Sequence, residues 1–92
     1  MQVSLKAIGD LRDYFGRTPT EIELPDGALA QSILAEIDTR WGANLPAYLW
    51  NRETCQFKGP VLLVIDKKAV RDLSTPLLDH TEILIMKAIA GG

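Results

Sequence analysis

The chain ends in two glycines, Gly91 and Gly92, and the α-carboxylate that follows them is the group here best suited to chemical modification. Both residues lack a Cβ atom, so they adopt positive φ angles and let another backbone approach closely. Because glycine is about 7% of residues in proteins, two adjacent terminal glycines arise by chance in about half a percent of chains. The pair predicts a slim terminus that fits a narrow enzyme channel.

A carboxylate does not react with nucleophiles at neutral pH, because its negative charge repels them and its oxygens leave poorly. It must therefore be activated. The sequence contains no phosphate-binding loop of the form G-x-x-x-x-G-K-[ST], no paired nucleophile and base, and no spacing of metal ligands. We therefore expect the chain to be no enzyme and to hold no cofactor or metal, but to serve as a substrate or carrier for partner enzymes.

Two other residues have reactive side chains. Cys55, the single cysteine, is a candidate persulfide relay, but a lone cysteine is more typical of a small packed residue. His80, the single histidine, lies between Asp79 and Thr81 in an expected turn and has no base and orienting group around it. We expect neither to be a functional site.

Length and charge narrow the function classes further. With 92 residues, we expect one domain over residues 1–90 and a flexible tail at 91–92. The net charge of −2 and the scattered basic residues argue against nucleic acid or a membrane as partner. The start of the chain lacks the pattern of a secretory signal, no apolar run is long enough to cross a bilayer, and a single cysteine suits a reducing compartment, so we expect a cytoplasmic protein.

The first quarter of the sequence predicts a β-hairpin. Residues 2–7 alternate between polar and apolar, as in a strand with one buried face, and residues 21–24 repeat this alternation after the turn residues Gly16 and Pro19.

A single amphipathic helix is expected next. Asp26 is a candidate N-cap, Gly42 is well placed to end the helix, and the apolar positions recur at helical spacing: Ala30, Ile33, Leu34, Ile37 and Trp41. For residues 43–58 the pattern is too brief to decide, although Leu45, Tyr48, Leu49 and Trp50 could form a short helix on the core.

The second half of the chain predicts further strands. Residues 61–65 are apolar on both faces, residues 66–68 suit a turn, and residues 69–70 suit a short return strand. Residues 72–79 indicate an irregular or 3₁₀ connection, and a last strand runs from 82 to about 89, with Ile83, Ile85 and Ile89 on one face.

One helix can cover only one face of such a sheet, so the opposite face, which also carries apolar residues, should be partly bare and implies a protein partner. The alternative is that residues 43–58 cover that face. Trp41 and Trp50 should fill the core, with Trp50 a candidate interface anchor. Lys67, Lys68 and Arg71 should form a hydrated turn face or dock an acidic partner.

These features together resemble the ubiquitin-like β-grasp sulfur carriers, the family of the molybdopterin synthase small subunit and the thiamin sulfur carrier. The resemblance runs nearly end to end, through LRDYFG (11–16), ELPDGA (23–28), VLLVI (61–65), LSTPLLDHTEI (73–83) and AGG (90–92). It implies an α+β fold with a mixed four- to five-stranded sheet and one main helix across one face. Residues 43–59 are longer than in the shortest thiamin-type carriers, which favours the molybdopterin type or a carrier dedicated to another pathway. His80 stands where a turn glycine is common.

The resemblance also implies a chemistry. An adenylating enzyme of the ubiquitin-activating type would use ATP to adenylate Gly92, a sulfur donor would convert the product to a thiocarboxylate, and a synthase subunit would accept the sulfur. Gly92 would carry the reactive carbon, and Gly91, which has no side chain, would let the terminus enter a narrow channel. Two alternatives remain: a ubiquitin-like modifier conjugated to lysines through Gly92, and a non-covalent interaction module.

Overall fold

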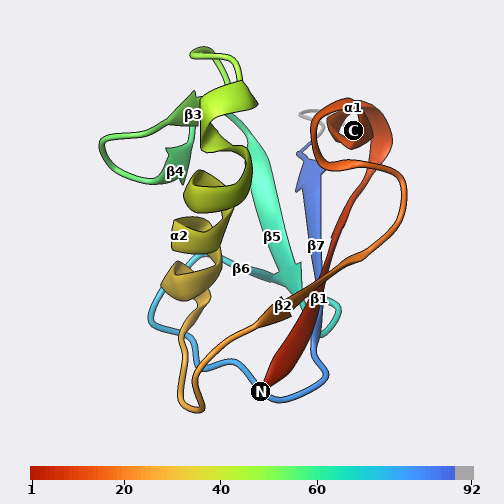
Figure 1. Ribbon diagram of the computed structural model, residues 1–92, viewed down its shortest axis with the longest axis vertical. Coiled ribbons are helices and arrows are strands. Elements are labelled where there is room, and N and C mark those ends of the chain that lie inside the picture. Colours follow the sequence, from red (N-terminus) through yellow and green to blue (C-terminus); the bar gives the residue numbers. More distant parts are fainter. Residues whose placement is uncertain (89–92) are drawn as a thin grey trace.

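The computed structural model describes residues 1–88, which form a mixed five-stranded sheet, one long helix and a small hairpin (Figure 1). The elements are β1 (Gln2–Ala7), the 3₁₀ turn η1 (Gly9–Leu11), α1 (Arg12–Phe15), β2 (Thr20–Glu23), α2 (Ala30–Trp41), the 3₁₀ turn η2 (Gly42–Asn44), β3 (Trp50–Asn51), β4 (Gln56–Phe57), β5 (Val61–Ile65), β6 (Lys68–Val70) and β7 (Glu82–Lys87). Within this part of the chain no helix is long and apolar enough for a membrane span.

The strand order of the main sheet is β2-β1-β7-β5-β6. β1 and β7 run parallel, whereas β1–β2, β5–β7 and β5–β6 are antiparallel. This arrangement confirms the expected α+β β-grasp fold, the N-terminal hairpin and the mixed sheet. The sheet has five strands, where four or five are expected.

The core lies between α2 and one face of the sheet. The alternating apolar residues of the strands point toward α2 and are buried, as are the apolar positions of the helix: Val3, Leu5, Ala7, Ile22, Leu63, Ile65, Ile83 and Ile85 from the sheet, and Ala30, Ile33, Leu34 and Ile37 from α2. The predicted period-two and helical patterns are therefore confirmed within the described residues, except that Trp41 is only partly buried and packs against the edge of the core. Ile89, expected on the same face of the last strand, lies outside them.

The predicted N-cap of the helix is wrong. α2 begins after Leu29, three residues beyond Asp26, whose carboxylate instead lies 3.3 Å from the nitrogen of Met1. The physical reason is that the first N–H groups of the helix bond to backbone carbonyls of the 72–79 connection: Ala30 N–H to Thr75 at 2.8 Å and Gln31 N–H to Leu73 at 2.9 Å. These carbonyls replace a side-chain cap.

Residues 43–58 do not form the short helix considered for Leu45, Tyr48, Leu49 and Trp50. The N–H groups of Leu49 and Trp50 both donate to the Pro46 carbonyl, and the chain then turns into the hairpin of β3 and β4. Leu45, Leu49 and Trp50 join the same core as α2, while Tyr48 is 72% exposed. The segment thus extends the helix side of the core, and the alternative that it covers the opposite face of the sheet is wrong.

A carboxylate joins this segment to the helix. Asp38 accepts hydrogen bonds from Trp50 Nε1 at 2.9 Å and from Arg52 Nε at 3.1 Å, and these two bonds lower its pKa. Because the folded pKa is the lower one, this stabilisation is complete above the unfolded aspartate pKa of about 3.9 and is lost as the pH falls through the folded value.

Gly42 follows the last residue of α2, as predicted, but glycine is required there by close packing rather than by a left-handed conformation, since its φ is −52°. A Cβ atom here would lie 2.6 Å from the Asp38 Oδ1 atom and 3.1 Å from Arg52 Nε. We expect Gly42→Ala to lower the free energy of unfolding by about 1–3 kcal/mol, measured by urea denaturation. The loss should shrink in an Asp38→Ala background, where the crowded carboxylate is absent; an equal loss there would contradict this explanation.

The turns of the second half lie where they are predicted, except that Lys68, expected in the turn, is the first residue of β6. Asp66 and Lys67 link β5 and β6 with φ angles of 52° and 68°, the signs required at both central positions of a type I′ hairpin turn. Residues 72–79 are irregular. His80 lies in the turn before β7, its N–H donates to the Gln2 carbonyl at 2.7 Å, and its φ is 63°.

This φ makes His80 a site where glycine should be preferred. A left-handed conformation costs an L-residue about 1–2 kcal/mol, against an entropic cost of about 0.5–1 kcal/mol for glycine. We expect His80→Gly to raise the free energy of unfolding by up to about 1 kcal/mol in urea denaturation. His80→Ala keeps the backbone cost and removes the imidazole, so it should be the less stable of the two variants; the reverse order would refute the argument.

Candidate functional site

The predicted site residues, Gly91 and Gly92, and the predicted tail at 91–92 lie outside the described residues. The structure does describe the segment that precedes them, which is the strand β7 and the residue after it, Ala88. We call this segment the platform.

β7 is a central strand held on both sides. It pairs with β1 and β5, the Ile8 N–H donates to the Ile85 carbonyl at 2.9 Å, and the Ala88 N–H donates to the Pro60 carbonyl at 2.6 Å. Ile83 and Ile85 are fully buried beneath α2. The backbone is therefore fixed in position up to four residues before Gly92.

Charged and aromatic side chains surround the end of β7, and we call Asp10, Tyr14, Tyr48, Lys58 and Lys87 the exit rim. The Lys87 ammonium lies 2.9 Å from Asp10 Oδ2, and this hydrogen bond lowers the pKa of Asp10. The hydroxyls of Tyr14 and Tyr48 are hydrogen-bonded at 3.0 Å, which raises the pKa of Tyr14. Tyr48, Lys58 and Lys87 also line a pocket of about 300 Å³ together with Pro60.

The exit rim is not predicted by the sequence. The sequence places Tyr48 with its apolar neighbours in a possible short helix, whereas the turn at Pro46 directs its side chain outward. Asp10 and Lys87 are 77 positions apart, and only the parallel pairing of β1 and β7 brings them together. A useful signal is present in the sequence: a tyrosine two residues after a proline, in a segment too short for an amphipathic helix.

On the side of the sheet away from α2 lies a stripe of apolar residues, which we call the open face. Leu84 pairs directly with Val64 and Met86 with Leu62, so these four side chains share one face, and all are only partly buried. This confirms the expectation of a partly bare apolar face. Surface of this kind is common at protein interaction sites.

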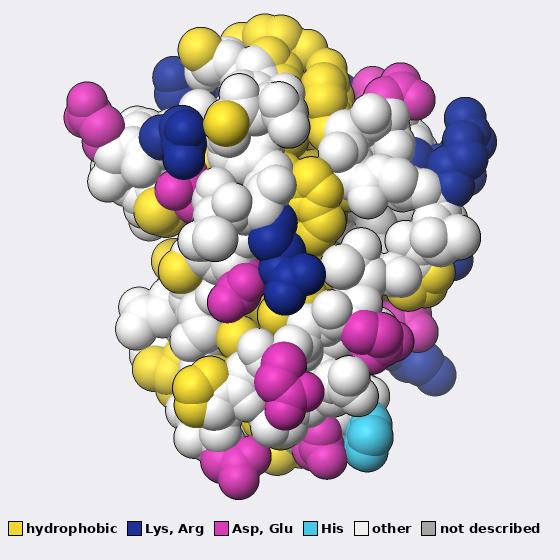
Figure 2. All heavy atoms as spheres, in the orientation of Figure 1, with side chains coloured by type: hydrophobic (Ala, Val, Ile, Leu, Met, Phe, Trp, Pro, Cys, Tyr) yellow, Lys and Arg dark blue, Asp and Glu magenta, His cyan; other side chains and the backbone are white. Residues whose placement is uncertain are grey.

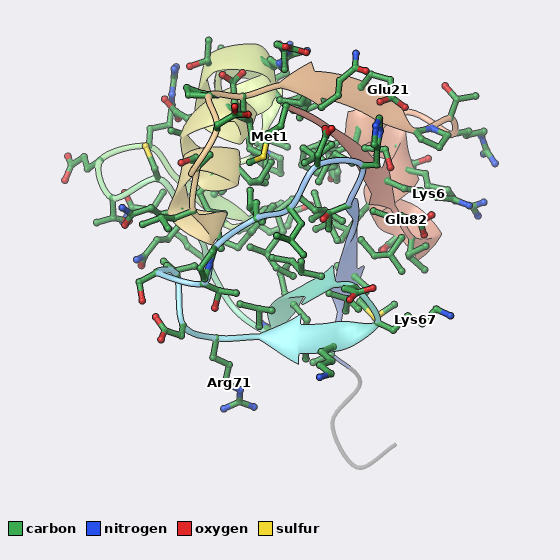
Figure 3. All side chains as sticks on the ribbon, turned by 90° about the horizontal axis from the view of Figure 1, so that it is seen from below. Met1, Lys6, Glu21, Lys67, Arg71 and Glu82 are labelled. Atoms are coloured by element: carbon green, nitrogen blue, oxygen red, sulfur yellow. The ribbon has the colours of Figure 1, made fainter. Side chains whose placement is uncertain are left out.

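The open face has a charged border. Lys6 pairs with Leu84, and Ser4 pairs with both Glu21 and Glu82, so the three charged residues lie on the same face as the stripe. Figure 3 shows Lys6, Glu21 and Glu82 projecting on the side of the sheet away from α2. An apolar centre with a polar rim is the usual composition of a protein interface.

The other residues considered from the sequence lie outside the exit rim and the open face. Cys55 is half-buried in the β3–β4 turn, and its thiol lies 3.8 Å from the Arg52 carbonyl. Trp50 is 2% exposed, so its alternative role as an interface anchor is wrong, and its predicted place in the core is confirmed. Lys67, Lys68 and Arg71 are exposed, as expected of a turn face. Residues 1–88 contain no group of three or more potential metal ligands.

Comparisons with known proteins identify the fold. No family model matches the chain, and no curated protein matches it. Solved structures do match. The archaeal modifier protein SAMP1 from Haloferax volcanii superposes with a TM-score of 0.78 at 14% identity, with both chains fully covered. A putative molybdopterin converting factor subunit 1 from Pyrococcus furiosus gives a TM-score of 0.72 at 20% identity, covering 96% of this chain and 98% of that one.

A third match comes from a protein complex. In the complex of subunits 1 and 2 of the molybdopterin-converting factor from Helicobacter pylori, the matching chain has a TM-score of 0.65 at 16% identity, with full coverage of both chains. At these identities the likeness concerns the fold. The chain therefore has the ubiquitin-like β-grasp fold, in the form shared by a small archaeal modifier and molybdopterin-converting factor subunits.

Proposed function

We propose that this protein is a sulfur carrier whose Gly92 carboxylate is adenylated by a partner enzyme, converted to a thiocarboxylate, and used as a sulfur donor in cofactor biosynthesis in the cytoplasm. The observation that carries the proposal is the position of β7: a central, doubly paired strand that is fixed up to Ala88 and followed within four residues by Gly91 and Gly92. Such a platform would hold the start of the terminal segment in a fixed position on the domain.

The chemistry follows from the poor reactivity of a carboxylate. ATP, consumed by the adenylating partner, supplies a good leaving group, and attack by a sulfur donor on the acyl carbon then displaces AMP. The resulting thiocarboxylate is a better sulfur nucleophile than the carboxylate is an oxygen nucleophile. Since the described residues offer no catalytic constellation, we assign the catalysis to the partners.

The molybdopterin pathway is favoured over the thiamin pathway. Two of the structures that share the fold are molybdopterin-converting factor subunits, and one of them is in a complex with its subunit 2. The open face would provide the docking surface for a comparable sulfur-accepting synthase subunit, with Leu62, Val64, Leu84 and Met86 at its centre.

Intact-mass analysis tests the proposal directly. The purified protein, ATP, sulfide and a competent activating enzyme are incubated together, and the mass should change by the replacement of one oxygen with sulfur. A Gly92-amidated protein is the matched control, because it keeps the fold but has no carboxylate to adenylate. If the unblocked protein never gains sulfur, the proposal fails.

A charge on the open face should weaken synthase binding. We expect Leu84→Glu to cost about 2 kcal/mol of binding free energy or more, because it places a carboxylate at the centre of an apolar contact. Isothermal titration calorimetry with the synthase subunit measures this. Thr39→Glu, which adds the same charge at an exposed position of α2, should bind normally. Equal affinities for the two variants would mean that the open face does not bind the subunit.

A second function is favoured by one specific observation: the archaeal structure that shares the fold is named as a modifier protein. In this case Gly92 would form an isopeptide bond with lysines of other proteins. Immunoblotting of cell lysate under reducing conditions would then show covalent adducts of higher mass, and their absence would argue against conjugation.

A further inference from the structure

The outer edge of the sheet has a gap beside β5. β6 pairs with only Leu63 to Ile65, so Val61 and Leu62 have no strand partner on that side within residues 1–88. The bond from Ala88 to the Pro60 carbonyl shows that Pro60 directs its backbone toward β7, and by alternation the Val61 carbonyl faces the gap. In the described part of the chain, no hydrogen bond is made to the Val61 carbonyl.

An apolar groove opens at this gap. Two adjoining pockets of about 450 and 290 Å³ share Leu34, Gln56 and Leu73, and they run between α2, β4 and the end of β6. We call this feature the edge groove, and the apolar residues that line it include Leu34, Cys55, Phe57, Val61, Val70 and Leu73. All of these except Leu34 are only partly buried, so the groove exposes apolar surface that the fold itself does not cover.

The charge at the edge groove is positive. Arg71 is the one charged residue that lines it, and it forms no ion pair within the described residues. Lys67 and Lys68 lie at the other end of the β5–β6 hairpin, where Lys68 pairs with Ile65. Figure 3 shows Arg71 projecting outward from the chain after β6, and Figure 2 shows that hydrophobic side chains on the surface gather in patches along the α2 side of the molecule.

We propose that the edge groove binds an extended peptide segment of another protein, with apolar residues flanked by carboxylates. A backbone N–H of the peptide would donate to the free Val61 carbonyl, as in strand addition at a sheet edge. Its apolar side chains would pack on Phe57, Val70 and Leu73, and a carboxylate would pair with Arg71. This site lies on the α2 side of the sheet edge and goes beyond the proposed function, because it does not involve Gly92.

A second copy of this chain fits the edge groove less well. Pairing two β6 edges would bring the Lys67, Lys68 and Arg71 side chains of one copy against the same cations of the other, and like charges on an edge oppose such pairing. A peptide with carboxylates has the complementary charge.

The test uses the full-length, ¹⁵N-labelled protein and a terminally blocked probe peptide of sequence Asp-Val-Ile-Leu-Asp. Saturable amide shifts are expected at residues 54–57, 61 and 70–73. Arg71→Glu should weaken binding about tenfold, which corresponds to roughly 1.4 kcal/mol. Arg17→Glu makes the same charge change at an exposed position away from the groove and should leave the affinity unchanged.

Three results would overturn the proposal: no saturable shift at millimolar peptide, equal binding of the control peptide Lys-Val-Ile-Leu-Lys, or shifts confined to Leu84 and Met86 on the open face. Repeating the titration with Gly92 deleted separates this proposal from the proposed function. Peptide binding should persist in that variant whether or not Gly92 carries sulfur.

Discussion

Deleting Gly92 should reduce sulfur transfer by about a hundredfold or more while leaving the fold intact. The deletion moves the terminal carboxyl group back along the chain by about 3.3–3.6 Å, whereas a misplacement of about 1 Å at a reacting centre can cost a hundredfold in rate. Because β7 is fixed up to Ala88, the platform cannot shift to compensate. Single-turnover sulfur transfer to the synthase measures the loss, and urea denaturation should show a change within about 0.5 kcal/mol.

A matched variant separates the effect of chain length from the effect of side-chain size near the terminus. Gly91→Ala keeps the length of the chain and adds one methyl group, so its loss should be smaller than that of the deletion but larger than that of Lys58→Ala on the exit rim. Unchanged activity after deletion of Gly92 would support the third possibility, in which the protein is a non-covalent interaction module.

Local patterns in the sequence predict much of the fold, because the residues on the buried face of each strand and helix recur at a fixed spacing. Ile83, Ile85 and the apolar positions of α2 needed no tertiary information to be placed. The N-cap of α2 failed because it depends on a contact across the fold: carbonyls of Leu73 and Thr75 cap the helix, and nothing near Asp26 indicates this.

The surface features were harder to predict for the same reason. The Asp10–Lys87 pair, the Tyr14–Tyr48 hydrogen bond and the gap beside β5 each combine segments far apart in the sequence. Gly91 and Gly92 can be proposed as the reactive site from the sequence because the proposal depends only on their residue type and their position at the terminus. Their role stays a prediction.

The largest loss of stability from a single substitution is expected at the strand that leads to the site. Ile85 is fully buried at the centre of the sheet, where it pairs directly with Ala7 of β1 and Leu63 of β5. Truncating a buried isoleucine to alanine removes its transfer free energy and leaves a cavity, at a cost of about 2–5 kcal/mol. A small domain has about 5–15 kcal/mol of stability in total, so Ile85→Ala should leave the protein marginally folded.

The neighbouring residue provides the control for this prediction. Leu84→Ala removes side-chain carbons from the same strand but on the open face, where half-burial limits the loss to about 1 kcal/mol. Urea denaturation of both variants should therefore show a much lower midpoint for Ile85→Ala. Synthase binding should be weakened in both variants, but for different reasons: Leu84→Ala loses a direct contact, whereas Ile85→Ala unfolds. Equal midpoints would mean that the two faces of β7 are equally buried, and the open face would then lose its basis as a docking surface.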